Sequence, residues 1–442
     1  MSTSLPAQPL DGAFAAHPAG RAAPRRRVIA AITIGNGLEF YDFTVYSFFA
    51  VLIGKLFFPV SGSFGQLMLS LATFGVGFVA RPLGGLLIGL YADRVGRKPA
   101  MALTLWLMGL GSLLFVVSPT YAQAGLAAPM LIVLARLLQG FALGGEVGAS
   151  TALLMEYADD HSRGYYGSWQ LFSQGVSVLL GAVVGLSLTN GLSPEALQSW
   201  GWRVPFAIGI LVIPLGLYIR RHLEETAEVP AAAAATGHER AGLAEIFRRH
   251  GRVVVAGVLL TIGGTSATYI VLHYMTSYAA TVLKIPLGLS MSAGCVAALV
   301  QVALSAYAGK LSDRIGRKPA ILWSRVAMLA LVYPAFLLLN ARPSLVTLLA
   351  VVAMLALPLV LNVVPTVVLI TELFPRRIRA SGLSVVYCIG VLVFGGFAQL
   401  IATWLIELTG NASAPALYVI GCGVVSLIGL AMVPETAGKR LD

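Results

Sequence analysis

The sequence predicts an all-α membrane protein of about twelve transmembrane helices, arranged as two related six-helix halves. Three observations predict this fold class: an apolar composition, a regular series of long apolar segments, and a loop motif that occurs twice. Hydrophobic residues make up 57% of the chain and charged residues only 11%, with a mean hydropathy of +0.84. Soluble globular proteins carry roughly 25% charged residues, so this chain has too few to cover a water-facing surface of its size.

The apolar segments follow one another along the chain and are separated by charge clusters or by turns rich in Pro, Gly and Asn. A segment of about 20 apolar residues is long enough to cross a bilayer. It must be helical there, because a lone segment in hydrocarbon has to satisfy its own backbone hydrogen bonds. The predicted spans are 28–56, 66–92, 99–118, 127–156, 164–190 and 201–221 in the first half, and 252–280, 289–311, 319–339, 343–372, 380–408 and 413–433 in the second.

The distribution of Lys and Arg predicts the orientation. Alternate loops carry clusters of basic residues, whereas the loops between them carry one at most. Basic loops stay in the cytoplasm, so an even number of spans places both termini there. We therefore expect a disordered cytoplasmic tail at 1–27, helix bundles at 28–221 and 252–433, a cytoplasmic linker at 222–251 and a second tail at 434–442.

A repeated loop relates the two halves. Residues 89–100 read GLYADRVGRKPA and residues 309–320 read GKLSDRIGRKPA, an offset of 220 residues. A second correspondence pairs Glu156 and Arg163 with Glu372 and Arg379, each seven residues apart after a fourth span of its half. Two halves of the same orientation are typical of parallel-repeat transporters, with the substrate path between them.

The GxxxDRxGRK loops resemble the signature loop of the major facilitator superfamily, and residues 434–438 (PETAG) are similar to its cytoplasmic PETxG segment. The resemblance implies alternating access between two bundles. Charges at helix ends can pair across the cytoplasmic mouth in one state and separate in another. The alternative is that the basic residues only set topology, which would leave the matched Asp93 and Asp313 unexplained. The predicted gating residues are Asp93, Arg94, Arg97, Glu156, Arg163, Asp313, Arg314, Arg317, Glu372 and Arg379.

Carboxylates inside predicted spans are candidates for proton coupling. An ionisable residue deep in a span costs roughly 2.5–3.5 kcal/mol on insertion scales, so it needs a functional or paired explanation. Glu39 and Asp42 share one helical face with Asn36, because the three are spaced three residues apart, and Glu146 lies in the fourth span. We predict proton pickup and release by Glu39, Asp42 or Glu146. The alternative is a structural ion pair with a neighbouring arginine.

Arginines inside the spans are candidates for substrate binding. Arg81 and Arg136 could bind a carboxylate through the guanidinium fork, or they could neutralise the acidic residues. Polar stripes add hydrogen-bonding groups, although such stripes often only pack helices together; His273 is expected near the outer end of its span. The predicted substrate-binding residues are Asn36, Arg81, Arg136, Gln139, Gln170, Gln174, Tyr269 and Asn362.

Three motifs, NGLEFYDF, FVARPLGGLLIGLYADRVGRK and RLLQGFALGGEVG, resemble the metabolite:proton symporter branch of the family. Its members take up organic acids such as citrate, or zwitterions such as proline and betaine. Residues 164–170 and 405–410 are most similar to citrate-type members. The resemblance implies proton-coupled uptake of a di- or tricarboxylate such as citrate. Uptake of a zwitterionic osmolyte and a non-transporting membrane sensor remain alternatives.

Other functional classes find no support in the sequence. The chain has no GxxxxGK[ST] phosphate loop for ATP, no cluster of ligands for a metal, and no arrangement of nucleophile and base for an enzyme. Its three cysteines are isolated, and its basic residues lie in short clusters instead of along a nucleic-acid-binding face. We expect a monomer without cofactors in a bacterial inner membrane, with lipid, a small organic anion and a proton as its partners.

Overall fold

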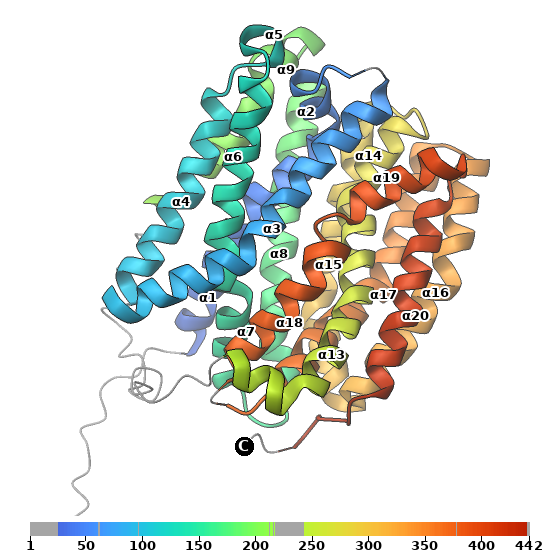
Figure 1. The fold of residues 1–442 in the computed structure, drawn as a ribbon. Coiled ribbons are helices and arrows are strands. Elements are labelled where there is room, and N and C mark those ends of the chain that lie inside the picture. Colours follow the sequence, from blue (N-terminus) through green and yellow to red (C-terminus); the bar gives the residue numbers. More distant parts are fainter. Residues whose placement is uncertain are drawn as a thin grey trace, which may run out of the picture.

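A computed structural model describes residues 25–60, 62–95, 97–211, 213–214, 216, 243–376 and 378–439. Within these ranges it places only the backbone of residues 25–28, 31, 89–90, 92–94, 97–98, 101, 145–147, 149 and 243–245. Helices make up the fold, as predicted. Figure 1 shows the blue-to-green helices of the first half packed beside the yellow-to-red helices of the second.

The first half contains four long helices and several short ones. Helix α1 is followed by α2 across a bend of 63°, and the fourth predicted span is divided between α6 and α7 by a 3₁₀ turn. The elements are α1 (Arg25–Phe48), α2 (Ala50–Phe57), α3 (Ser63–Val95), α4 (Arg97–Val117), α5 (Tyr121–Ala124), α6 (Ala127–Ala142), η1 (Leu143–Gly145), α7 (Glu146–Glu156), α8 (Arg163–Gly191), α9 (Pro194–Ser199), η2 (Gly201–Arg203) and α10 (Val204–Ile210).

The second half repeats this pattern with longer helices. Its first span contains a π-helical segment, η3, which is an uncommon geometry that occurs frequently at functional sites. The elements are α13 (Leu243–Thr268), η3 (Tyr269–Tyr274), α14 (Met275–Thr281), α15 (Leu287–Ile315), α16 (Arg317–Ala341), α17 (Leu345–Glu372), α18 (Arg379–Phe394), α19 (Ala398–Thr409) and α20 (Ala414–Ala431).

Eight helices of the described residues are long and apolar enough to cross a membrane, or nine if the bent α1–α2 pair is one span. Two shorter apolar helices, Ala102–Val117 and Ala127–Ala142, occupy the third and fourth predicted spans. The chain is therefore a multi-pass membrane protein, and the count of twelve spans stays a prediction.

Helix α13 begins inside the predicted linker and breaks at His250, where φ is −120° and ψ is 18°. Its first turns are amphipathic, with Ile246 buried and Phe247 exposed.

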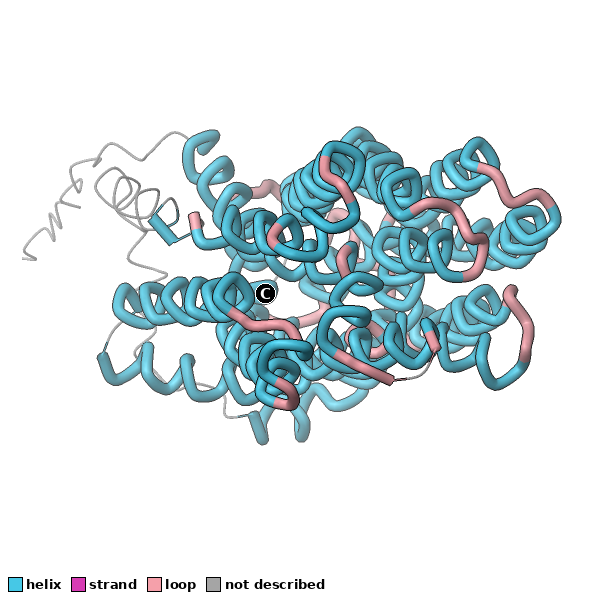
Figure 2. Tube along the Cα trace, turned by 90° about the horizontal axis from the view of Figure 1, so that it is seen from above, coloured by secondary structure: helices cyan, strands magenta, loops and turns pink. Residues whose placement is uncertain are grey.

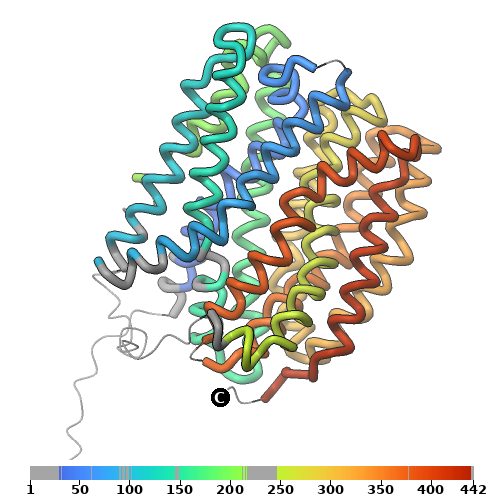
Figure 3. The backbone as a smooth tube through the Cα atoms, viewed as in Figure 1, coloured from blue at the N-terminus to red at the C-terminus, as the bar shows by residue number. Residues whose placement is uncertain are grey.

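Helix α8 of the first half packs along α15 of the second, and α7 packs against α18. Figure 3 traces the chain through both halves in the view of Figure 1, and Figure 2 shows the helices from above. Gly164 and Gly309 allow the first of these contacts. A Cβ on Gly309 would lie 2.3 Å from the Gly164 carbonyl oxygen, and one on Gly164 would lie 2.5 Å from the Gly309 oxygen. Only glycine at both positions allows this backbone contact.

The glycine of the repeated motif ends α15. Gly316 has a φ of 99°, in the left-handed region that favours glycine, and α16 begins at the next residue. A Cβ there would also lie 2.9 Å from Oε2 of Glu435. The motif therefore needs glycine both for the sharp turn and for the approach of the chain that follows α20.

Candidate substrate and proton site

A cavity of about 70 Å³ lies between the two halves. Helices α1 and α8 line it from one side and α13, η3, α15, α17 and α18 from the other. Of the predicted substrate residues, Gln170, Gln174 and Tyr269 line this cavity. A buried water needs roughly 10–15 Å³ of such volume, so the cavity accommodates only a few waters. At this volume the cavity has no room for a substrate of several carbons.

Arg81 and Arg136 lie behind a layer of aromatic rings next to this cavity. Phe43, which lines the cavity, is 4.6 Å from the Arg81 guanidinium carbon and 4.3 Å from that of Arg136. Arg81 also lies 4.0 Å from the ring of Phe78, and Arg136 lies 5.0 Å from that of Phe74. Cation–π contacts of this kind hold a desolvated cation without neutralising it.

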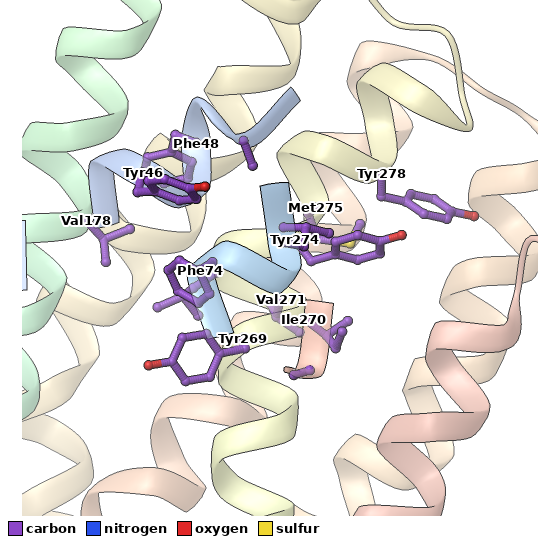
Figure 4. Packing of buried hydrophobic residues seen from close by; sticks show 14 of the residues in the cluster. Tyr46, Phe48, Phe74, Val178, Tyr269, Ile270, Val271, Tyr274, Met275 and Tyr278 are labelled. Atoms are coloured by element: carbon purple, nitrogen blue, oxygen red, sulfur yellow. The ribbon is translucent and has the colours of Figure 1, made fainter. Parts of the chain in front are cut away.

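The aromatic layer reaches across to the second half. Tyr269 lies 5.6 Å from Phe78 and 6.0 Å from Phe74, measured between ring centroids. Figure 4 shows Phe74 and Tyr269 side by side. The arginine pair is thus separated from the cavity by a single layer of side chains.

Both arginines retain free donors. Nε and Nη2 of Arg81, and the same two atoms of Arg136, have no hydrogen-bond acceptor among the described residues. Both side chains are buried, Arg136 completely. Because an unsatisfied buried donor is costly, and more so on a charged group, these atoms are well suited to receive an anionic ligand.

A chain of hydrogen bonds links Arg136 to Asp42. Nη1 of Arg136 donates to Oε1 of Gln139 over 2.9 Å, and Nε2 of Gln139 donates to Oγ of Ser112 over 3.2 Å. Ser112 Oγ in turn donates to Oδ2 of Asp42, whose Oδ1 has no donor among the described residues. The structure therefore brings together three predicted residues and adds Ser112, which no sequence feature distinguishes from other serines in spans. Glu39 is also buried, on the same helix as Asp42 (α1).

The side chain of Glu146, the third predicted proton carrier, lies outside the described residues.

Asn36 and Gln170 bind each other: Nε2 of Gln170 donates to Oδ1 of Asn36 over 2.8 Å, and Nδ2 of Asn36 donates to Oγ of Ser173 over 2.5 Å. Asn36 therefore joins α1 to α8, while Gln170 also faces the cavity.

Asn362 does not line the cavity and instead binds α16. Its Oδ1 accepts from Nη2 of Arg325 over 2.5 Å, and its Nδ2 donates to the Ile321 carbonyl over 3.0 Å. Arg325 was not predicted, although it is an ionisable residue inside the predicted span 319–339. The rule that selected Arg81 and Arg136 would have found it.

His273, expected near the outer end of its span, lines the cavity from the π-helical segment. Its ring stacks on Tyr269 at 5.2 Å and lies 6.2 Å from Phe48. Nδ1 has no partner among the described residues.

A second polar cluster joins the halves at the ends of α8, α15, α16 and α17. Oδ1 and Oδ2 of Asp313 accept from the backbone N–H groups of Gly164 and Tyr165, over 2.8 and 2.9 Å. Arg317 contacts Asp313 at 2.7 Å and Glu372 at 3.1 Å. Four predicted gating residues, Arg163, Asp313, Arg317 and Glu372, therefore meet in one network.

The remaining gating predictions have different environments. Arg314 and Glu156 are exposed. Arg379 is buried, and its Nε and Nη2 have no acceptor within the described ranges. The side chains of Asp93, Arg94 and Arg97 lie outside the described residues.

The PETAG segment completes this cluster. Oε1 and Oε2 of Glu435 accept from the backbone N–H groups of Arg317 and Lys318, over 2.9 and 2.8 Å. Burial alone would raise the pKa of Glu435. Backbone donors, which also include Thr436 and Ala437, outweigh burial and hold the pKa below its usual value.

Known proteins identify the family. The model of the Major Facilitator Superfamily matches residues 32–387. The chain belongs to this superfamily. The match confirms the resemblance of the repeated loops to the signature loop of this superfamily. The members of the superfamily are transporters.

Relatives in this superfamily cover almost the whole chain. A "Citrate-proton symporter" of Klebsiella pneumoniae is 34% identical over 90% of both chains. A "Proline/betaine transporter" of Salmonella typhimurium is also 34% identical, over 94% of this chain and 85% of its own length. The xylose transporter XylE of E. coli, in a partially occluded inward-open conformation, has the same fold, with a TM-score of 0.76 at 18% identity over 94% of this chain and 99% of its own. The expected inner-membrane location agrees with these bacterial relatives.

Proposed function

We propose that this superfamily member is a proton-coupled symporter that takes up a small organic acid, with a di- or tricarboxylate such as citrate favoured. The observation that carries the proposal is the arginine pair Arg81 and Arg136, buried beside the central cavity with donors that have no acceptor in the described part of the chain. Guanidinium groups whose Nε and Nη2 have no acceptor among the described residues fit carboxylate groups through paired N–H donors. The relatives named for citrate–proton symport support the same substrate class.

The proton site that we propose is Asp42, with Glu39 and Glu146 as further carriers. Asp42 is connected to Arg136 through Ser112 and Gln139. When Asp42 takes up a proton, Arg136 loses the attraction of a nearby carboxylate and its positive charge becomes available to a substrate anion. Substrate binding and protonation then favour each other, which is the condition for symport.

The transport cycle would alternate the access of this site. In the proposed orientation, with twelve spans and both termini in the cytoplasm, the Arg163–Glu372 cluster closes the cytoplasmic side. Its charges separate when the halves rock apart. If net positive charge moves inward, the membrane potential contributes about 2.3 kcal/mol per charge per 100 mV.

Proton symport of a zwitterionic osmolyte is the second candidate. Phe40, Phe43, Tyr269 and Tyr387 line the cavity, and aromatic faces bind quaternary ammonium groups. Relatives named proline/betaine transporters match the chain at similar identity.

Counterflow of labelled citrate in proteoliposomes separates the two candidates. We expect 2-oxoglutarate to compete with citrate and betaine and proline not to compete. A protein for which betaine competes and carboxylates do not would refute the organic-acid proposal.

A further inference from the structure

A third buried arginine lies in the second half of the protein. Arg325 on α16 is 2% exposed, and its Nε has no acceptor among the described residues. Its hydrogen bond goes to Asn362, a neutral amide, and no described Asp or Glu pairs with it. A buried guanidinium without an anionic partner is strongly destabilising, so its presence in a span calls for a functional explanation.

The Arg325 guanidinium lies against the wall of the central cavity. Gly264 of α13 and Val363 of α17 both line the cavity. A Cβ on Gly264 would lie 3.8 Å from Nη2 of Arg325 and 3.8 Å from Cγ2 of Val363. At this point, which we call the Gly264 window, Gly264 contributes no side chain over Nη2 of Arg325.

The adjacent glycine has a different role. A Cβ on Gly263 would lie 2.8 Å from Nη1 of Arg325 and 2.4 Å from Cβ of Ser426. Gly263 is therefore required for packing against α16 and α20. Gly264 has room for a methyl group at ordinary contact distance, so the packing of the closed conformation does not require glycine there.

We infer that Arg325 binds a second carboxylate group of the substrate through the Gly264 window. This inference rests on the proposed function and extends it to substrate selection. The first half offers the Arg81–Arg136 pair to one carboxylate, and the second half offers Arg325 to another. A di- or tricarboxylate satisfies both cationic groups, whereas a monocarboxylate or a zwitterion leaves one of them unpaired. Arg325 is thus a specificity-determining residue.

The test uses the full-length protein in proteoliposomes, with counterflow of labelled citrate. Competition by succinate is compared with competition by butyrate, which has the same carbon chain and one carboxylate fewer. The variants are Arg325→Gln and Gly264→Ala, with Arg342→Gln, an exposed residue beyond the end of α16, as the matched control. Because Arg325→Gln also loses the bond to Asn362 and can fail to fold, Gly264→Ala tests the inference independently.

We expect both test variants to raise the half-saturating citrate concentration by about tenfold or more, the size of one lost charge-assisted hydrogen bond. Their preference for succinate over butyrate should fall by a similar factor, while Arg342→Gln behaves as wild type. Unchanged half-saturation and unchanged succinate preference in Gly264→Ala and folded Arg325→Gln would overturn the inference. If the wild type itself transports no citrate and no carboxylate competes, the proposed function fails and the inference falls with it.

Discussion

Arg163 and Glu372 connect the two halves of the protein: Nη1 of Arg163 lies 3.5 Å from Oε1 of Glu372, and both side chains are buried. The same carboxylate receives Arg317 from its own half and a hydrogen bond from the Thr436 hydroxyl over 2.5 Å. Glu372 therefore has partners from α8, α16 and the segment after α20. Any motion that separates α8 from the end of α17 must break the contact between Arg163 and Glu372.

Glu372→Gln should favour opening at this end. Removing one partner of a buried ion pair costs roughly 3–5 kcal/mol, and here the cost falls on the closed state. Cys388 is a native probe, because its Sγ lies 3.5 Å from the Gly144 carbonyl across the interface between the halves. With Cys295 and Cys422 replaced by Ala, we expect N-ethylmaleimide to modify Cys388 at least about tenfold faster in Glu372→Gln.

Glu407→Gln, which removes an exposed carboxylate on α19, is the control for this experiment. It should leave the modification rate unchanged. Equal rates in Glu372→Gln and wild type would show that this cluster does not hold the closed state together.

Asp42→Asn should uncouple transport from the proton gradient. An amide cannot carry the proton, so the variant should keep citrate counterflow and lose accumulation driven by an imposed pH gradient. Accumulation to the wild-type level by Asp42→Asn would assign the proton to another residue, with Glu39 next to be tested.

Arg136→Lys should weaken substrate binding while conserving charge. Lysine lacks the planar fork and the face that stacks against Phe43 and Tyr46. We expect a rise of about tenfold or more in the half-saturating citrate concentration. Arg342→Lys is the matched control, and a wild-type value for Arg136→Lys would mean that charge alone is sufficient.

Glu435→Gln should lower thermal stability in a pH-dependent way. The folded-state pKa of Glu435 is lowered, so its contribution is present above the ordinary carboxyl pKa of 4.5 and is lost as pH falls through the lowered value. The Tm difference between variant and wild type should be largest near pH 7 and vanish at acidic pH. The loss of helical circular dichroism on heating in detergent measures it, and a difference that persists in acid would contradict this account.

Gly140→Ala should prevent correct packing of α3 against α6. A Cβ there would lie 1.7 Å from the Gly77 carbonyl oxygen, so one backbone would have to move. Overpacking typically costs about 1–3 kcal/mol and more where backbone must shift. We expect a clear loss of monodisperse protein in size-exclusion chromatography, whereas Gly421→Ala, whose Cβ meets no atom within 4 Å, should resemble wild type.

The composition and the repeated loop were enough to predict the helical membrane fold and the family. These features are local: an apolar segment of span length has to be helical in lipid, and the DRxGRK loop is read directly from the chain. The same local rule identified Arg81, Arg136 and Asp42, because a charge inside an apolar segment stands out against its neighbours. It applied equally to Arg325, which was missed.

Tertiary structure alone decided which of these residues meet. Asn36 and Asn362 have similar sequence environments to cavity residues, but helix rotation directs them to Gln170 and Arg325. Ser112 joins Asp42 to Gln139 although nothing in its own segment indicates a site. The periodicity of a helix defines its faces, but which neighbour each face meets depends on the packing of both halves. The sequence by itself thus determined the repeated helical halves and most of their buried charges, and packing determined the cavity, the Arg163–Glu372 cluster and the place of Arg325 behind Gly264.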